Sequence, residues 1–153
     1  MSLLSKVFGV GLSLALASHA VAADKVQITA DTFTVTETSH EAVFTGNVVV
    51  NHPAVLVHAD KVVATYGEGG TTDIKTFVAT GHVELKTSDQ NATGEKAVFT
   101  PSDQLLRLTG NVLVTNSGGT VGAGELVVNM ATNVSTFTGG DSGKRVTGVF
   151  TSQ

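Results

Sequence analysis

Apolar and polar residues alternate with a period of two along most of the chain after residue 24. In Val26-Gln-Ile-Thr-Ala30 every second side chain is apolar, and Leu126, Val128 and Met130 repeat this pattern near the C-terminus. Such alternation places apolar side chains on one face of a β-strand. We find no helical periodicity of useful length in this part of the sequence. We therefore expect an almost wholly β protein of roughly a dozen or more short antiparallel strands.

Two short motifs recur in turn along the chain and identify it as a repeat. One contains the step Thr-Gly, with its glycines at Gly46, Gly81, Gly110 and Gly139. The other is a small residue followed by an acid, with the acids at Asp31, Asp60, Glu95 and Glu125. Successive glycines are 35, 29 and 29 residues apart, and successive acids are 29, 35 and 30 residues apart. Residues 67–73 lie within both 35-residue intervals and are interpreted as a loop inserted in one repeat. We expect about four stacked units of 29–35 residues that bury their apolar faces together.

The alternation changes phase at each step from a small residue to an acid, as between Ala30 and Phe33. A bend at these steps would keep the apolar residues on one side. The Thr-Gly steps would supply a second corner, because glycine adopts backbone angles that strain other residues. The regular spacing of the four acids therefore favours a structural turn over a pair of catalytic carboxylates.

The N-terminus has the three parts of a secretory signal. Lys6 precedes an apolar run over residues 7–17, and the small residues Ala20-Val-Ala-Ala23 follow. The run is too short to span a bilayer comfortably, although an uncleaved membrane anchor is the alternative. We expect a signal peptide at residues 1–23, an exported chain, and one β domain at residues 24–153.

Composition narrows the classes of function. The 153 residues include 24 Val and 22 Thr, which pack well in strands. The chain has no cysteine and therefore no disulfide or thiol chemistry. A net charge of −4 with 14% charged residues excludes a strongly basic nucleic-acid binder.

Candidate catalytic and metal-binding residues are few. His52 and His58 would share a face of one extended strand, about 20 Å apart at ~3.3 Å per residue, which is too far for one metal ion. Residues 140–143 look like part of the nucleophile loop of trypsin-like proteases, but Lys144 replaces that family's next glycine, and an ordinary turn is favoured. We expect no enzyme activity, no metal site and no cofactor.

A stack of β units leaves an unpaired strand at each end, which is a template for another chain. We expect these free edges at residues 25–30 and 146–151, and two such ends could join head to tail. The continuous apolar face could form a trough, where burying an acyl chain would contribute ~0.8 kcal/mol per CH₂. It could also close on itself as an ordinary core, and composition alone does not choose between the two.

These motifs resemble the OstA-like family, the periplasmic proteins of Gram-negative lipopolysaccharide transport. The resemblance extends over residues 24–151 and rests on the mature start, the Thr-Gly-Asn-Val corners, the small residue–acid–Lys turns and the ending Gly143-Lys-Arg-Val-Thr-Gly-Val-Phe150. It implies an open, twisted antiparallel β-jelly-roll whose interior holds lipid A acyl chains. It also implies a soluble periplasmic bridge. Such a bridge joins end to end with copies of itself, with a relative anchored in the inner membrane and with an outer-membrane barrel relative.

We therefore expect a non-enzymatic lipopolysaccharide-binding protein of the periplasm that takes part in lipid transport and outer-membrane assembly. One alternative is a secreted structural β-repeat that assembles through its strand edges without lipid, and a second is an enzyme acting on cell-envelope sugars. The predicted lipid-binding residues share the apolar side of the alternating segments and are Val26, Ile28, Phe33, Val35, Val48, Val50, Val55, Val57, Phe77, Val83, Leu85, Phe99, Leu106, Leu108, Val112, Val114, Leu126 and Val128.

Overall fold

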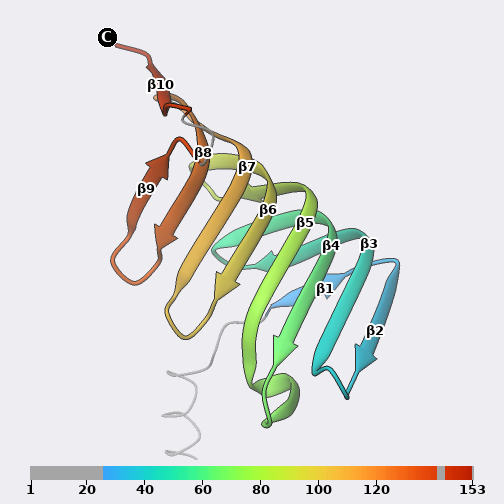
Figure 1. Ribbon diagram of the computed structural model, residues 1–153. Coiled ribbons are helices and arrows are strands. Elements are labelled where there is room, and N and C mark those ends of the chain that lie inside the picture. The colour runs from blue at the N-terminus through green and yellow to red at the C-terminus, as the bar shows by residue number, and fades with distance from the viewer. Residues whose placement is uncertain (1–25, 141–143, 153) are drawn as a thin grey trace, which may run out of the picture.

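The computed structural model describes residues 26–140 and 144–152, which form ten β-strands in a single antiparallel sheet (Figure 1). One short 3₁₀ turn, η1 (Gly70–Thr72), lies between the fourth and fifth strands. The predicted all-β, open antiparallel architecture is thereby confirmed. The strands are β1 (Gln27–Thr29), β2 (Thr32–Thr36), β3 (Glu41–His52), β4 (Val55–Tyr66), β5 (Ile74–Lys86), β6 (Gln90–Thr100), β7 (Leu105–Asn116), β8 (Gly119–Asn129), β9 (Val134–Thr138) and β10 (Thr147–Phe150).

Two pairs of short strands behave as single interrupted strands. The strand order is β1-β3-β4-β5-β6-β7-β8-β10, while β2 also pairs with β3 and β9 also pairs with β8. β1 pairs with residues 49–51 of β3, and β2 pairs with residues 41–45 of the same strand. In the same way, β10 pairs with residues 119–122 of β8, and β9 pairs with residues 125–129. Each of the four repeats therefore supplies two strands of the sheet.

The strands bend at a common level, which we call the bend line. There, the two residues Gly46 and Asn47 of β3 lie opposite the single residue Asp60 of the neighbouring strand β4. Gly46 has a φ of 87° and Asn47 a φ of 46°, in the left-handed region that glycine adopts without strain. Each neighbouring pair from β3 to β8 has such a register shift, and β-bulges of this kind bend a strand and increase its twist.

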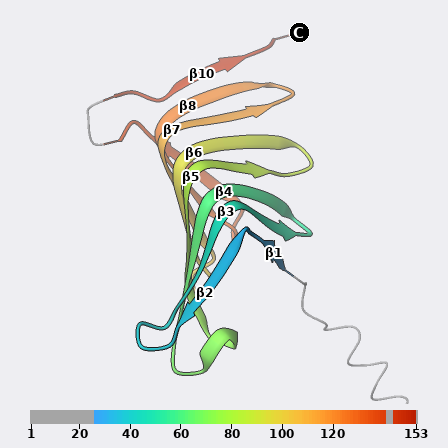
Figure 2. The same cartoon turned by 90° about the vertical axis from the view of Figure 1, so that its right-hand side faces the viewer.

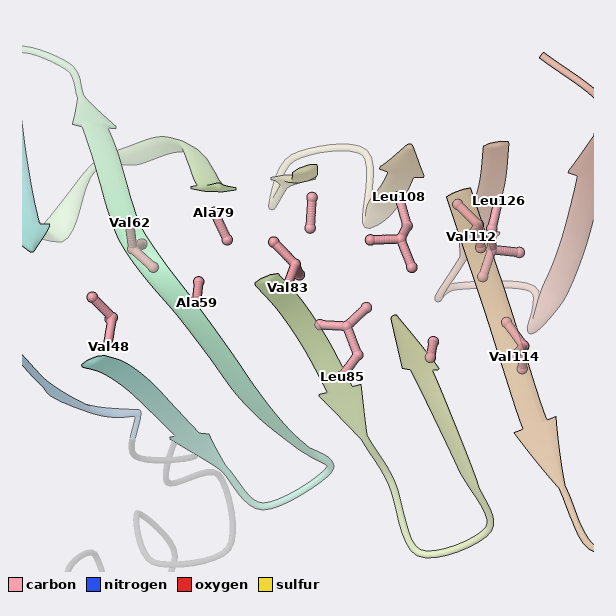
Figure 3. Packing of buried hydrophobic residues seen from close by; sticks show 12 residues of the cluster. Val48, Ala59, Val62, Ala79, Val83, Leu85, Leu108, Val112, Val114 and Leu126 are labelled. Carbon is pink, nitrogen blue, oxygen red and sulfur yellow. The ribbon is translucent and has the colours of Figure 1, made fainter. Parts of the chain in front are cut away.

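The bend line divides the sheet into two halves that face each other at an angle (Figure 2). The upper half contains β1, β10 and the hairpin turns β3–β4, β5–β6 and β7–β8. The lower half contains β2, β9 and the connections β4–β5 and β6–β7. We call the side on which the halves face each other the inner face, and buried apolar side chains gather there around the bend line (Figure 3).

The expected dozen short strands proved wrong in both number and length. Six of the ten strands, β3 to β8, contain 11–13 residues. The small residue–acid steps and the Thr-Gly steps, predicted as bends and corners between short strands, mostly lie inside long strands, because a β-bulge bends a strand without ending its pairing. The sequence shows the bend but not that pairing continues on both sides of it.

The predicted insertion at residues 67–73 is confirmed as the connection between β4 and β5. Its conformation is held by Asp73, whose Oδ1 lies 2.9 Å from Lys75 Nζ and whose Oδ2 accepts a hydrogen bond from the Gly69 N–H at 3.4 Å. The hydrogen bond from Lys75, followed by that from Gly69, lowers the pKa of Asp73 from its ordinary value of 3.8.

Two predictions fall on residues that the structure does not describe. The signal peptide at residues 1–23 lies outside the described ranges, as do residues 141–143 of the segment that resembles a protease loop. Within residues 26–140 and 144–152, no helix is long and apolar enough to cross a membrane.

Candidate functional site

The inner face is built from rows of apolar residues that run across the sheet from one edge to the other. Residues paired directly in an antiparallel sheet point to the same side, so the strand register defines each row. The longest row lies in the lower half beside the bend line, beginning on β2 and ending on β9. It consists of Phe33, Phe44, Val62, Ala79, Ala97, Leu108, Leu126 and Phe137.

Two further rows extend the inner face away from the bend line. The lower one contains Val35, Ala42, Ala64, Phe77, Phe99, Leu106 and Val128 and ends at Ser135. The upper one contains Ile28, Val50, Val57, Leu85, Ala92, Val114 and Val121 and ends at Gly148. Between the rows, Val48, Val83 and Val112 complete the inner face beside the bend line.

The predicted lipid-binding residues lie together. Val26 precedes β1 and is 50% exposed, and the other seventeen are strand residues whose register places them on the inner face. Thr34 and Glu84, which alternate in the sequence with predicted lipid-binding residues, pair with Val43 and His58 on the outer face. Contact of the predicted lipid-binding residues with lipid stays a prediction.

Sequence reasoning missed the residues that complete these rows. Five of them are alanines, which carry little hydrophobic signal and gain their position only through pairing with larger neighbours. Phe44 and Phe137 precede a Thr-Gly step just as the predicted residue Leu108 does, so the repeat itself could have identified them. The missed residues are Ala42, Phe44, Val62, Ala64, Ala79, Ala92, Ala97, Val121 and Phe137.

Burial differs between the centre of the inner face and its ends. Leu108 is fully buried, and Val48 and Val83 are each 1% exposed, so the two halves pack as an ordinary core around the bend line. At the N-terminal edge, however, Phe33 is 56% exposed although its ring stacks on Phe44 with centroids 4.4 Å apart. Phe150 is 69% exposed at the opposite edge. The inner face is therefore closed at its centre and reaches solvent at both ends of the sheet.

All phenylalanines of the described residues contribute to the inner face. Five of them stand in the two lower rows, and Phe150 lies two residues beyond Gly148 on β10, on the same side of that strand. The upper half is otherwise lined by aliphatic side chains. Aromatic surface, which the composition makes scarce, is thus concentrated on the lower half of one face.

The repeat acids hold the bend line rather than form a catalytic site. A Cβ atom built on Gly46, Gly81 or Gly110 would collide with the side chain of the preceding acid, which occupies that space. His82 Nδ1 lies 2.9 Å from Asp60 Oδ2, and Asn47 Nδ2 donates to Asp31 Oδ2 at 3.4 Å. The acid of each of the first three repeats therefore packs on the glycine of the following strand. In the fourth repeat Glu125 instead pairs with Arg107 at 3.0 Å.

The histidine geometry expected from the sequence is wrong. His52 pairs with Val55 and His58 with Val49, because the chain reverses between β3 and β4. The reversal places the two histidines on opposite faces of one hairpin instead of along one face of an extended strand. Among the described residues, no group of three or more His, Cys, Asp or Glu side chains is placed to hold a metal ion.

Two pockets of about 430 and 390 Å³ open near the C-terminal end of the bend line. Both are lined by the glycines Gly110, Gly124, Gly139 and Gly140, with mainly polar neighbours. No residue of the three apolar rows lines either pocket. The inner face is therefore the candidate functional site.

Known proteins are similar to this chain in sequence and in fold. Residues 27–134 match the family described as LptA/(LptD N-terminal domain) LPS transport protein. An uncharacterized protein of Rhizobium meliloti strain 1021 is 30% identical over 114 residues, which is 70% of this chain. The match spans 61% of the length of that relative.

The fold also matches a solved structure. LptH, described as the LptA-homologous periplasmic component of the lipopolysaccharide transport device of Pseudomonas aeruginosa, aligns with a TM-score of 0.69. The alignment covers 84% of this chain and 96% of LptH at 18% sequence identity. At that identity, the likeness shows a shared fold.

Proposed function

Because the chain belongs to the family of LptA/(LptD N-terminal domain) LPS transport proteins, we propose that it binds lipopolysaccharide in the periplasm and bridges the two membranes. In this role the inner face shields the lipid A acyl chains while the sugar faces water. The proposal is supported above all by one observation: rows of apolar side chains that cross the whole sheet and reach solvent at both edges.

The chemistry of the inner face suits an acyl chain. Aliphatic and aromatic side chains can surround a flexible hydrocarbon without directional bonds, and each CH₂ removed from water contributes about 0.8 kcal/mol. The packed centre limits where lipid can enter. We propose that acyl chains first contact the exposed edges of the inner face, at Phe33 or Phe150, and reach the centre by separating the two halves.

We propose that the partners of the chain bind at the two edges of its sheet. Copies of the chain would join end to end through the edges of the sheet, and a membrane-anchored relative and an outer-membrane barrel relative would occupy the two ends of the bridge. We further propose that the chain acts without catalysis or cofactor. The four repeats together build one continuous apolar face, which suits the binding of a hydrocarbon chain. The energy for lipid movement would come from elsewhere in the transport system.

Site-specific photo-crosslinking tests the lipid-binding role. A photo-crosslinking residue at Phe33 or Phe99 on the inner face should label purified lipopolysaccharide. The same residue at Thr34 or Glu84, which lie on the outer face beside these strands, should not. Equal labelling from both faces would contradict the proposal, because it would show that lipid does not distinguish them.

The alternative role, a secreted β-repeat that assembles without lipid, is favoured by the exposed apolar residues at both edges. It would be supported if purified chain formed oligomers but neither retained lipid on purification nor labelled lipopolysaccharide from any inner-face position. Mass spectrometry of the purified protein separates these two outcomes.

A further inference from the structure

The bend line is built differently in the fourth repeat. In each of the first three repeats the acid packs on the glycine of the following strand, but Glu125 instead turns to Arg107 at 3.0 Å. A Cβ atom built on Gly139, the fourth glycine, would have main-chain atoms of Lys144 as its closest neighbours. The fourth glycine is therefore bordered by peptide groups instead of by a packed carboxylate.

The residue that follows the glycine also differs. It is Asn47, His82 or Asn111 in the first three repeats and Gly140 in the fourth. Gly140 keeps a left-handed backbone, with a φ of 85°, but contributes no side chain. The larger of the two pockets, about 430 Å³ in volume, opens at this level. We call it the C-terminal hollow.

The C-terminal hollow opens on the outer side of the sheet. Gly122 and Thr147, which pair directly and both line it, belong to the same outer-face row as Glu84. The chain that leads into β10 runs on this outer side of the bend line (Figure 2). A ligand in the hollow would therefore not compete with an acyl chain on the inner face.

Two cations line the C-terminal hollow. Lys144 and Arg145 are both exposed, and they are the one pair of adjacent cations in the sequence. Neither forms a salt bridge with another residue of the described ranges. Their charges can therefore meet an anion that enters the hollow.

Main-chain groups contribute to the same wall. β9 ends at Thr138, and beyond it Gly139 and Gly140 form no main-chain hydrogen bond with any other residue that the structure describes. At the opposite end of the bend line, by contrast, the Asp31 N–H donates to the Gly46 carbonyl at 3.0 Å. The two C-terminal glycines therefore present N–H groups to the hollow instead of to a strand.

We propose that the C-terminal hollow binds a phosphate group, held by Lys144, Arg145 and the main-chain N–H groups of the adjoining glycines. The planar guanidinium of Arg145 matches phosphate oxygens in a bidentate arrangement. Glycine lets the main chain approach a ligand closely, and successive N–H groups form anion-binding concavities. A phosphate group offers three acceptor oxygens, which suits the three kinds of donor on this wall. The proposal goes beyond the lipid role and does not depend on it.

One carboxylate opposes the ligand. Glu95 lines the hollow and packs on Gly110, so its negative charge weakens the binding of an anion. Glu125, beside the smaller pocket, is already paired with Arg107. The two cations therefore outnumber the one unpaired repeat acid on the wall, and removal of the Glu95 charge should strengthen binding.

Titration with inorganic phosphate tests the site. We would follow the main-chain amides of the full chain by ¹H–¹⁵N NMR at constant ionic strength. The amides of Gly124, Gly139 and Gly140 should shift to saturation with one common Kd, while those of the β3–β4 hairpin should not move. Shifts that rise linearly without saturation, or that spread over the whole sheet, would overturn the proposal.

Charge-matched variants make the outcome specific. K144A/R145A should weaken phosphate binding by about tenfold or more, since hydrogen bonds to charged groups are lost. The control K61A/K96A removes the same charge from two exposed residues of the outer face that do not line the hollow, and should leave the Kd nearly unchanged. E95Q should tighten binding by about threefold. Equal weakening in both double variants would show a general effect of charge and would reject the site.

Lipopolysaccharide and its dephosphorylated form then distinguish the source of the phosphate. If only the phosphorylated form shifts the three glycine amides, the site takes a phosphate of lipopolysaccharide. If neither form does but inorganic phosphate still saturates the site, the ligand is a free phosphate compound. Failure of lipopolysaccharide to label the inner face would reject the lipid role alone, because phosphate binding at the hollow is measured without lipid.

Discussion

The carboxylate of Asp60 on β4 lies over Gly81 on β5 and fills the space that a side chain at residue 81 would need. Gly81 has a φ of 80°, and His82 beside it binds the same carboxylate through Nδ1. The acid and the glycine of a repeat are therefore one structural unit, although they lie 21 residues apart in the sequence. Their regular spacing reflects the bend line.

Substitution at Gly81 should destabilise the protein through two separate effects. Gly81→Ala places a Cβ at positive φ, which costs about 1 kcal/mol, and also forces the Asp60 carboxylate to move. Gly70 has a φ of 78° but no atom near a built Cβ, so Gly70→Ala carries only the first cost. We expect Gly81→Ala to lower the free energy of unfolding more than Gly70→Ala does, as measured by urea denaturation.

The contribution of the acid can be isolated. Adding Asp60→Ala to Gly81→Ala should recover part of the lost stability, because the new methyl group then has room. If the double variant is instead less stable than the sum of the single changes predicts, the carboxylate does not oppose the Cβ and the packing explanation is wrong.

Leu108 should be the most sensitive aliphatic position of the inner face. It is fully buried where the two halves meet, so Leu108→Ala leaves a cavity and should lower the free energy of unfolding by about 3 kcal/mol. Leu113 on the same strand is 46% exposed and faces outward, and Leu113→Ala should cost about 0.5 kcal/mol or less. Similar losses for both variants would show that the halves do not pack as described.

The pH dependence of the β4–β5 connection follows from Asp73. Its pKa is lowered in the folded chain, so the interaction with Lys75 stabilises the fold above the ordinary pKa and is lost as the pH falls through the folded value. Asp73→Asn should lower the melting temperature slightly at pH 7, with the difference from the unchanged chain shrinking toward pH 3. Because both side chains are exposed, the effect should also diminish in high salt.

The sequence predicts the inner face well and the strand boundaries poorly, for a physical reason. Alternation with period two is a local signal, so residues such as Val83 and Leu85 are assigned to one side without knowledge of their neighbours. Whether a strand continues past Gly81 depends on hydrogen bonds to the next strand, which no local pattern records. The alanines at positions 79 and 97 gain their place in the same way, from their partners.

The edges of the sheet were also only partly predictable. β1 and β10 end the strand order, as the sequence predicts, but β2 and β9 are edges as well. Strand structure is interrupted at residues 30–31 and again after residue 138. Each outermost strand is therefore divided into two short strands, β1 and β2 at one edge and β9 and β10 at the other.

Removing β10 tests whether the upper half of the sheet takes part in assembly. Deleting residues 144–153 removes β10 but leaves β9, which pairs with β8 through residues 134–138. We expect a folded chain that still binds lipopolysaccharide and that associates only at concentrations about tenfold higher. One of the two edge strands at this end of the sheet is lost, and roughly 1.4 kcal/mol corresponds to that factor. Replacing Gly148 and Val149 by proline should have a similar effect, because proline lacks the donor N–H that edge pairing requires. Light scattering over a range of concentrations measures both. If the deletion leaves the concentration dependence unchanged, β10 takes no part in end-to-end association and the upper half of the sheet ends freely in solvent.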